Sequence, residues 1–246
     1  MTNRVTYEEP MPNFFSGGGQ LNGKTRLFCD LGSNVGQSVM AFLKWKRESA
    51  LEYDVFCFEP NIEFIPAWMS NIFPIQSHLG SVNLIPSIVG SNNNDYMEEF
   101  DGWQLAEFGG VRSRDRLVPI FDFASWLMSI KNRYSEIIVK MDIEGAEYKL
   151  ISDMHYSGSL RYIDSIFMEI HGHKRGFSRG DTDKMINMIY RNGVTPFLWE
   201  ADLDGTLLYD PNLLLAQIIP SNYIITNSKT KKENFNSLHD IMLIKR

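Results

Sequence analysis

The chain has 246 residues, of which 43% are hydrophobic and 22% are charged, as in an ordinary globular domain that folds without disulfides or metals. Its formal net charge of −6 argues against broad electrostatic attachment to nucleic acid or to an anionic membrane. No apolar signal core begins the sequence, and no stretch is long and apolar enough for a membrane span, so we expect a soluble, cytoplasmic protein.

Taken in chain order, the predicted elements alternate between strands and helices. Residues 1–25 contain two prolines and three consecutive glycines and are expected to form an irregular arm, whereas residues 26–246 are predicted to form a single domain. Strands are predicted at residues 26–31, 54–59, 82–89, 136–142, 162–170 and 194–199. Helices are predicted at about residues 35–48, 62–72, 122–131, 144–155 and 181–192. Because several of the strands are apolar nearly throughout, this alternation predicts a doubly wound, mostly parallel α/β sheet.

Three parts of the chain depart from the alternation. Residues 220–226 and 239–245 are predicted strands without a clear helix between them, which favours an antiparallel pair at the end of the sheet. Residues 91–119 and 200–219 are predicted insertions, and both a binding loop or lid and a solvated surface loop fit them. The first insertion holds arginines near Trp103 that could contact an acceptor: Arg112, Arg114 and Arg116.

A predicted strand runs directly into a tight turn and a helix at the segment Asp30–Gly36, with the sequence DLGSNVG. Gly32 and Gly36 would let the backbone turn sharply and approach a ligand closely. Asp30 can accept hydrogen bonds from a cationic amino-acid moiety or a hydroxyl. The next strand ends at Glu59, which would lie beside the turn and could accept from both hydroxyls of a ribose. The two features in this order predict a site for a ribose-bearing cofactor.

The spacing of the glycines bears on which cofactor it is. A dinucleotide site would read Gly-x-Gly-x-x-Gly, with a central glycine that makes room for a pyrophosphate, and Asn34 occupies that place here. A cofactor without a pyrophosphate suits the turn better, and S-adenosylmethionine is the common one.

The most distinctive segment is Lys140–Glu147, with the sequence KMDIEGAE, at the end of an apolar strand. It gathers Asp142, Glu144 and Glu147 at the edge where open α/β sheets bind ligands. Glu144 and Glu147 could instead serve the positive end of the following helix, so a ligand-binding role and a helix-end role both stay open for them.

In order and spacing, four segments together resemble the FkbM family of methyltransferases over roughly residues 26–172. They are the glycine turn, the Phe58–Asn61 segment, the Lys140–Glu147 segment and Phe167–His171 on the next strand. The resemblance implies a class I (Rossmann-like) methyltransferase fold, with a seven-stranded sheet and an antiparallel last strand. It also implies S-adenosylmethionine-dependent methyl transfer to a hydroxyl of a sugar, a glycan or a glycosylated small molecule.

The residues that the resemblance implies for cofactor binding follow the first three strands: Asp30, Gly32, Ser33, Asn34, Gly36, Glu59, Pro60, Asn61 and Ser87. Asp30 and the glycine turn would line the methionine end of the cofactor, and Glu59 would hold the ribose. Ser87 would lie near the adenine, in place of an acidic residue.

Methyl transfer to an alcohol needs alignment of the reacting atoms, and a general base or a metal that lowers the pKa of the hydroxyl. His171 is the preferred base because imidazole titrates near neutrality. Asp142 is the alternative base, and Lys140 is included in the candidate catalytic set. In a third interpretation, Asp142, Glu169 and His171 bind a divalent ion such as Mg²⁺. The structural alternative for His171 is a histidine bonded to a neighbouring carbonyl at the end of a strand.

Other classes of function stay open at this stage. A nicotinamide-dependent oxidoreductase is disfavoured by Asn34 and by the lack of an evident Tyr-x-x-x-Lys pair. A non-catalytic binding protein on the same fold is disfavoured because the carboxylates at the sheet edge are intact. A methyltransferase acting on a non-sugar small molecule or on a nucleic acid is a weaker variant, and the acidic balance of the chain opposes the nucleic acid.

Overall fold

The computed structural model describes residues 25–90, 98–99, 117–171, 176–199, 223–227 and 241–245. The predicted arm and the second insertion therefore lie outside the described residues, except for Thr25, which begins the first strand. The same holds for most of the first insertion, including its three arginines. Within the described helices, none is long and apolar enough to cross a membrane.

The centre of the molecule is a six-stranded sheet in which every neighbouring pair of strands is parallel. Its order from edge to edge is β10-β9-β8-β1-β2-β3. The strands are β1 (Thr25–Leu31), β2 (Tyr53–Phe58), β3 (Ser81–Ile85), β8 (Tyr134–Met141), β9 (Ser165–Met168) and β10 (Thr195–Leu198). The order runs outward from β1 in both directions, as expected for the doubly wound sheet that the sequence predicts.

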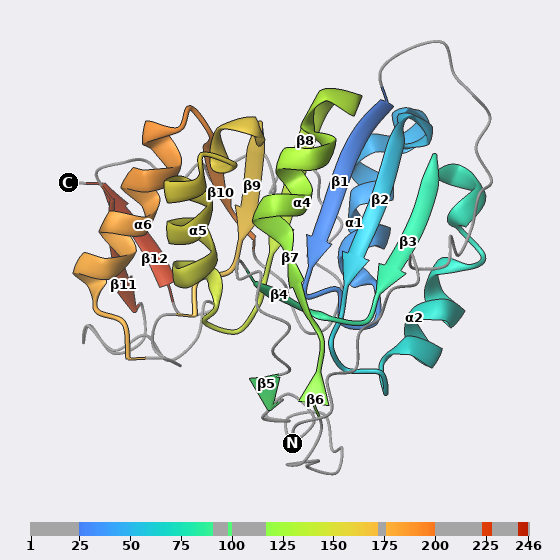
Figure 1. The fold of residues 1–246 in the computed structure, drawn as a ribbon, viewed down its shortest axis with the longest axis horizontal. Helices are drawn as coiled ribbons and strands as arrows, with labels where there is room; N and C mark the ends of the chain where they lie inside the picture. The colour runs from blue at the N-terminus through green and yellow to red at the C-terminus, as the bar shows by residue number, and fades with distance from the viewer. Residues whose placement is uncertain are drawn as a thin grey trace, which may run out of the picture.

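Helices cover both faces of the sheet (Figure 1). They are α1 (Gln37–Lys46), α2 (Ile65–Ile72), α4 (Phe123–Ile130), α5 (Glu147–Ser157) and α6 (Arg179–Arg191). Short 3₁₀ turns join them to the strands: η1 (Arg47–Glu52), η2 (Gln76–His78), η3 (Lys131–Arg133) and η4 (Leu160–Tyr162). The ends of these five helices lie within three residues of the predicted amphipathic segments, because each has one apolar face to bury.

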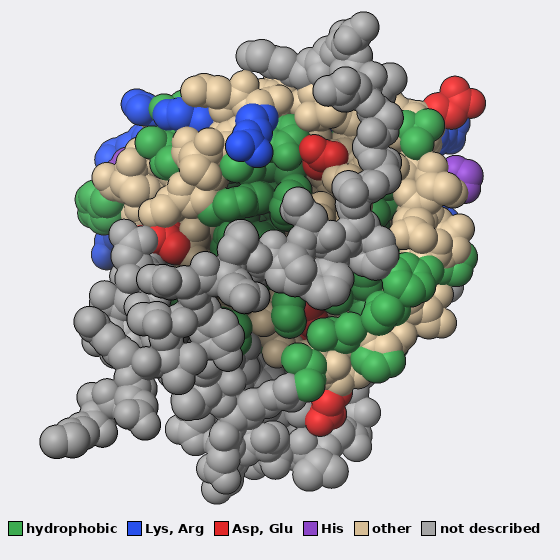
Figure 2. All heavy atoms as spheres, turned by 45° about the vertical axis from the view of Figure 1, so that its right-hand side comes forward, with side chains coloured by type: hydrophobic (Ala, Val, Ile, Leu, Met, Phe, Trp, Pro, Cys, Tyr) green, Lys and Arg blue, Asp and Glu red, His purple; other side chains and the backbone are tan. Residues whose placement is uncertain are grey.

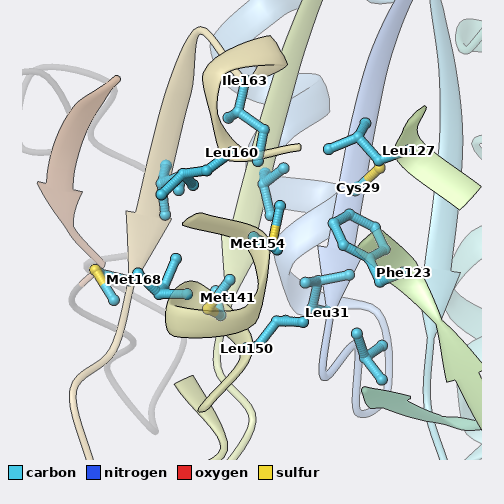
Figure 3. Close-up of a cluster of buried hydrophobic side chains, with 14 of the residues drawn as sticks. Cys29, Leu31, Phe123, Leu127, Met141, Leu150, Met154, Leu160, Ile163 and Met168 are labelled. Carbon is cyan, nitrogen blue, oxygen red and sulfur yellow. The ribbon is translucent and has the colours of Figure 1, made fainter. Parts of the chain in front are cut away.

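The sheet separates two buried clusters, one on each face. Alternate residues of β1 divide between them, since Leu27, Cys29 and Leu31 pack under α4, α5 and α6, whereas Phe28 packs on the opposite face with α1 and α2. Figure 3 shows the first cluster, with Cys29 and Leu31 facing Phe123 of α4. Each fully buried side chain of this size contributes about 2 kcal/mol, so the two clusters fix the position of the strand ends.

Helix α2 has a buried face and an exposed apolar face. Trp68 and Ile72 are buried against the chain that follows β1, whereas Ile62 just before the helix, Met69, and Phe73 at its end are each more than a third exposed. Figure 2 shows apolar side chains at the surface on this side of the molecule. The buried face of α2 is the one that bears on the candidate site.

The predicted strand at residues 82–89 is two strands. β3 ends at Ile85, and β4 (Ile88–Gly90) leaves the sheet to pair in parallel with β7 (Ile120–Asp122). Pro86 lies at the break, and because proline has no N–H to donate, it cannot continue the ladder. The chain after β3 therefore turns beneath the ends of the main strands (Figure 1).

The predicted antiparallel pair at the end of the chain is present as β11 (Tyr223–Asn227) and β12 (Ile241–Lys245). The two strands pair with each other in a separate two-stranded sheet and do not extend the main sheet. Another short antiparallel pair joins β5 (Glu98–Glu99) and β6 (Leu117–Val118). In the described part of the chain the main sheet thus has six strands, and the seventh, reversed strand stays a prediction.

Candidate functional site

The carboxyl ends of the parallel strands meet at one edge of the sheet, where the arrowheads of β1, β2 and β3 point in Figure 1. The backbone ladder continues one residue past several strands. The N–H of Glu59 donates to the carbonyl of Ile85, that of Asp142 to Leu31, and that of Glu169 to Met141. The carboxylates after β2, β8 and β9 are therefore held at the sheet edge by the backbone itself.

The turn after β1 is bonded to the end of β2. The N–H groups of Gly32 and Ser33 both donate to the carbonyl of Phe58, at 3.0 Å each. The N–H of Asn34 donates to Glu59 Oε2 at 2.7 Å. Asn34 has a φ of 48°, in the left-handed region that asparagine tolerates better than most residues, and this conformation turns its N–H toward Glu59.

Both glycines of the turn are needed because the protein itself comes close. A Cβ on Gly32 would lie 1.8 Å from the carbonyl oxygen of Asp142, and one on Gly36 would lie 2.9 Å from Ile72 Cδ1. The sequence interpretation assigned these spaces to a ligand. In the structure, the end of β8 and the buried face of α2 fill the places of the two Cβ atoms, so the fold itself needs these glycines, and contact of the turn with a ligand stays a prediction.

Glu59 is almost completely buried, and backbone amides hold both its oxygens. Its Oε1 accepts from the N–H of Asn61 at 2.7 Å, and its Oε2 accepts from Asn34. Burial raises the pKa of Glu59 to about 7, against the lowering effect of the two amide hydrogen bonds. The group therefore changes charge near neutral pH.

Asp30 is buried beneath the turn. Its Oδ2 accepts from Ser33 Oγ at 2.7 Å, and Ser33 Oγ in turn accepts from the indole N–H of Trp68 at 3.0 Å. Sequence reasoning missed Trp68, since an aromatic residue in an amphipathic helix reads as core. Because Asp30 has no exposed surface, it positions the turn in this structure rather than facing a ligand directly.

Lys140 joins the ends of β1 and β8. Its ammonium donates to the carbonyl of Gly32 at 2.7 Å and lies 3.4 Å from both Asp30 Oδ1 and Asp142 Oδ2. Burial opposes the charge, but Asp142, Asp30 and Glu169 outweigh it and raise the pKa of Lys140. The lysine predicted as a catalytic candidate is thus a buried, protonated group that positions its neighbours.

His171 lies between carboxylates from two strand ends. Its Nδ1 is 3.1 Å from Glu147 Oε1, and its Nε2 is 3.1 Å from Glu169 Oε2. Two further carboxylates face Nε2, with Glu144 Oε2 at 3.8 Å and Asp142 Oδ1 at 3.9 Å. All three residues of the predicted metal set thus lie around His171 Nε2, but the residues whose ligand atoms all lie within 4.8 Å of one another are Asp142, Glu144 and His171, with Glu144 in place of the predicted Glu169.

The environment of His171 corrects its predicted role as a base that titrates near neutrality. Burial lowers the pKa of His171, but hydrogen bonds to Glu147 and Glu169 and the charge of Asp142 outweigh burial and raise it to about 11. In this arrangement the imidazole carries a proton on each nitrogen at neutral pH and cannot accept one. Burial also raises the pKa of Glu169, as does the nearby charge of Asp142.

Glu147 begins α5, as the helix-end interpretation expected. Its Oε1 also accepts from the N–H of Ile143 at 3.1 Å, so one oxygen closes the turn after β8 and orients His171. Asp142 directly follows β8, and its side chain is partly exposed. Glu144 lies beside His171 and not at the end of α5.

The edge thus holds two groups of polar residues. The β1–β2 cluster consists of Asp30, Ser33, Asn34, Glu59 and Asn61, and the β8–β9 cluster consists of Asp142, Glu144, Glu169 and His171. Lys140 lies between them.

Several buried polar atoms at this edge make no hydrogen bond to the described residues: Asp30 Oδ1, Asn61 Nδ2, Ser87 Oγ, Asp122 Oδ2 and Glu147 Oε2. Asp30 Oδ1 has the ammonium of Lys140 at 3.4 Å. Because buried polar atoms in folded proteins are nearly always satisfied, the other atoms mark places where a ligand or water completes the structure. Asn61 and Ser87 belong to the predicted cofactor set, and Pro60 lies beside Asn61. Asp122, the N-cap of α4, was not predicted, and its β7 pairs with β4 just after Ser87.

Comparison with known proteins gives one solved structure to report. No protein-family model and no curated protein matches the chain. The structure is similar to that of methyltransferase FkbM from Methylobacillus flagellatus KT, with a TM-score of 0.40 and 14% sequence identity. The similarity covers 89% of this chain and 43% of that one, so this chain spans less than half the length of that protein. The neighbour bears the name of the family that the sequence motifs resemble.

Proposed function

We propose that this chain is an S-adenosylmethionine-dependent O-methyltransferase that acts on a hydroxyl of a sugar, a glycan or a glycosylated small molecule. The observation that carries the proposal is Glu59, a buried carboxylate at the end of β2 that the glycine turn after β1 holds in place. Beside it, Asn61 and Ser87 each have a buried polar atom without a partner among the described residues. A ribose with its adjoining base would supply hydroxyls and ring nitrogens for such groups.

The hydrogen bonds of the turn favour this cofactor over a dinucleotide. A pyrophosphate needs free N–H groups at the turn and the helix start, but those of Gly32 and Ser33 are bonded to Phe58 and that of Asn34 to Glu59. S-adenosylmethionine has no phosphate, and its sulfonium is a cation that suits an edge rich in carboxylates.

Bound S-adenosylmethionine would supply a methyl group on a positively charged sulfur, ready for displacement by an oxygen. We assign its binding to the turn residues Gly32, Ser33, Asn34 and Gly36 and to Glu59, Pro60, Asn61 and Ser87. Asp30 holds the turn through Ser33, and Lys140 holds the turn through the carbonyl of Gly32. Their contribution is alignment, which displacement reactions depend on strongly.

The acceptor would enter at the β8–β9 cluster, where the side chains of Asp142, Glu144 and Glu169 retain 23%, 28% and 14% of their exposure. Two ways of activating a hydroxyl fit these residues. A carboxylate, Asp142 first, accepts its proton, or a cation held by the carboxylates lowers its pKa. A sugar is the proposed acceptor class because of the family resemblance.

Isothermal titration calorimetry with S-adenosylmethionine and its demethylated product tests the cofactor. We expect saturable binding that Glu59→Gln weakens by about tenfold or more, since a carboxamide cannot accept from both Asn34 and Asn61. Glu63→Gln is the matched control, because Glu63 is an exposed carboxylate in the same segment, and its affinity should equal that of the wild type. Absence of heat with either compound contradicts the proposal.

A further inference from the structure

We propose that the β8–β9 cluster is a binding site for a divalent cation of the oxygen-preferring class, Mg²⁺ or Mn²⁺. Its ligands are one oxygen each from Asp142, Glu144 and Glu169 and the Nε2 atom of His171. The sequence interpretation considered a metal at three of these residues, and the geometry adds Glu144 and an orienting role for Glu147.

Three of the four ligand atoms, those of Asp142, Glu144 and His171, are spaced as neighbours around one ion, and Glu169 approaches the same nitrogen of His171. The carboxylate oxygens of Glu169, Glu144 and Asp142 lie 3.1, 3.8 and 3.9 Å from His171 Nε2. The atoms of Asp142, Glu144 and His171 all lie within 4.8 Å of one another. With metal–oxygen distances of about 2.1 Å, adjacent ligands of one ion lie about 3 Å apart and opposite ones about 4 Å apart. Shifts of a few tenths of an ångström would bring Asp142, Glu144 and His171 onto one ion, whereas Glu169, which is not in that group, would have to move further to share it.

Asp142 and His171 each direct one ligand atom, Oδ1 and Nε2, toward the proposed ion and bond another residue with the second atom. Asp142 Oδ2 faces Lys140, so Oδ1 is left toward His171. The other nitrogen of His171, Nδ1, bonds the fully buried Glu147. A carboxylate behind the far nitrogen is the usual arrangement for a metal-binding histidine, because it fixes the tautomer and the ring orientation.

Charge at this edge also favours a cation. Asp30, Asp142, Glu144, Glu147 and Glu169 surround two groups that can carry positive charge, Lys140 and His171. Carboxylates gathered in a partly buried site repel one another unless positive charge compensates them. A divalent ion at Nε2 of His171 would add positive charge among these described carboxylates.

The buried Glu147 gives a second, independent sign that the cluster is incomplete. Its Oε2 has no hydrogen-bond partner among the described residues, although the side chain has no exposed surface. This oxygen belongs to the carboxylate that bonds the far nitrogen of His171, so the group that completes it would lie behind the imidazole and help to fix the ring whose Nε2 faces the proposed ion.

The ligand set indicates which ion it is. Three carboxylate oxygens and one imidazole form a hard set without sulfur, which suits Mg²⁺ or Mn²⁺ better than the softer ions that cysteines bind. Partial exposure of the three carboxylates leaves room for a further ligand from solvent. In the proposed methyl transfer that ligand would be the acceptor hydroxyl, and this role alone, not the existence of the site, depends on the proposed function.

Titration of Mn²⁺ into chelator-treated protein, followed by electron paramagnetic resonance without any cofactor, tests the site. We expect one saturable Mn²⁺ that Mg²⁺ displaces. Glu144→Gln and Glu169→Gln should each weaken the binding by more than tenfold, and Glu147→Gln by about tenfold because it acts through His171. Glu48→Gln, a change in an exposed carboxylate on η1 before β2, is the matched control and should leave the affinity unchanged.

Circular dichroism tests whether each variant is folded. Glu144→Gln is the decisive variant because Glu144 has the most exposed side chain of the three carboxylates, so its substitution disturbs the fold least. No saturable Mn²⁺ binding up to about 10 mM, or binding that Glu144→Gln and Glu169→Gln leave unchanged, overturns the proposal. Because no cofactor is present, Mn²⁺ binding without S-adenosylmethionine binding would refute the proposed function and leave the site intact. Binding of S-adenosylmethionine without binding of Mn²⁺ would refute the cation site alone.

Discussion

In the β1–β2 cluster the carboxylate of Glu59 is held by two backbone N–H groups, whereas in the β8–β9 cluster three carboxylates converge on the imidazole of His171. Fixed backbone dipoles satisfy the first carboxylate without adding a full positive charge. In the second cluster, the described residues instead include three carboxylates around one imidazole. This difference suits the first cluster to a neutral, hydroxyl-bearing group and the second to a cation.

Lys140 is the point at which the two clusters meet, and its removal should have the largest effect. Lys140→Met leaves Asp30 and Asp142 without their shared ammonium and should reduce the free energy of unfolding by about 3–5 kcal/mol, as measured by chemical denaturation. Lys149→Met, which removes a mostly exposed partner of Asp153, is the control and should change it by less than about 1 kcal/mol. Equal effects of the two substitutions would mean that Lys140 does not link the clusters.

The close approach of the two strand ends gives the second prediction. Gly32 and Gly193 have nearly the same φ, 79° and 78°, but only Gly32 has a backbone atom in the place of a Cβ. Gly193→Ala should cost about 1 kcal/mol for its left-handed conformation, and Gly32→Ala should cost at least about 2 kcal/mol more because it pushes Asp142 away. Thermal unfolding compares the two variants, and equal losses would contradict the contact between the turn and β8.

The pKa of Glu59 gives a pH test of the β1–β2 cluster. Because burial raises the pKa from 4.5 to about 7, the contribution of Glu59 to stability is present in full below about pH 4.5 and is lost as the pH rises through 7. Cofactor binding should show the opposite trend, since the ionised carboxylate accepts hydroxyls better. We expect the affinity for S-adenosylmethionine to rise about tenfold between about pH 6 and pH 8.

Glu59→Gln serves as the control for that experiment, because its side chain does not titrate. The variant should bind the cofactor weakly at every pH and should lose the dependence near pH 7. A wild-type affinity that stays constant over this range would show that the charge of Glu59 does not contribute to binding.

The smallest effect is expected for Trp68. Trp68→Phe keeps an aromatic ring against the turn but removes the N–H that donates to Ser33 Oγ, at a cost of about 1 kcal/mol. A double-mutant cycle with Ser33→Ala isolates the bond, and the two substitutions should couple by a similar amount. Additive effects would mean that Trp68 acts through apolar packing alone.

Most of the fold was predictable because its strands are short apolar runs between amphipathic helices, as at β8 and α5. The two differences have separate causes. Pro86 ends β3 in the middle of a run that is apolar on both sides, and whether the predicted β11–β12 pair joins the main sheet depends on tertiary contacts that periodicity does not contain.

The candidate residues were also predictable one segment at a time, whereas their connections were not. Asp30 and Lys140 are 110 positions apart in the numbering, and their ion pair exists because β1 and β8 are adjacent with these residues in register. The high pKa of His171 likewise needs carboxylates from two strand ends, so the usual imidazole pKa misled the sequence interpretation. Glu144 reaches the cluster in a turn where its own φ is 57°, a left-handed conformation that the residue types do not predict.

The central claim is that one sheet edge carries two separate sites, and affinities of two ligands in two variants test it most directly. Calorimetry with S-adenosylmethionine and with Mn²⁺ should find that Glu59→Gln weakens the cofactor and keeps the cation, whereas Glu144→Gln weakens the cation and keeps the cofactor. If each substitution weakened both ligands alike, or if neither ligand bound the wild-type chain, the division of the edge into a cofactor site and a cation site would be wrong.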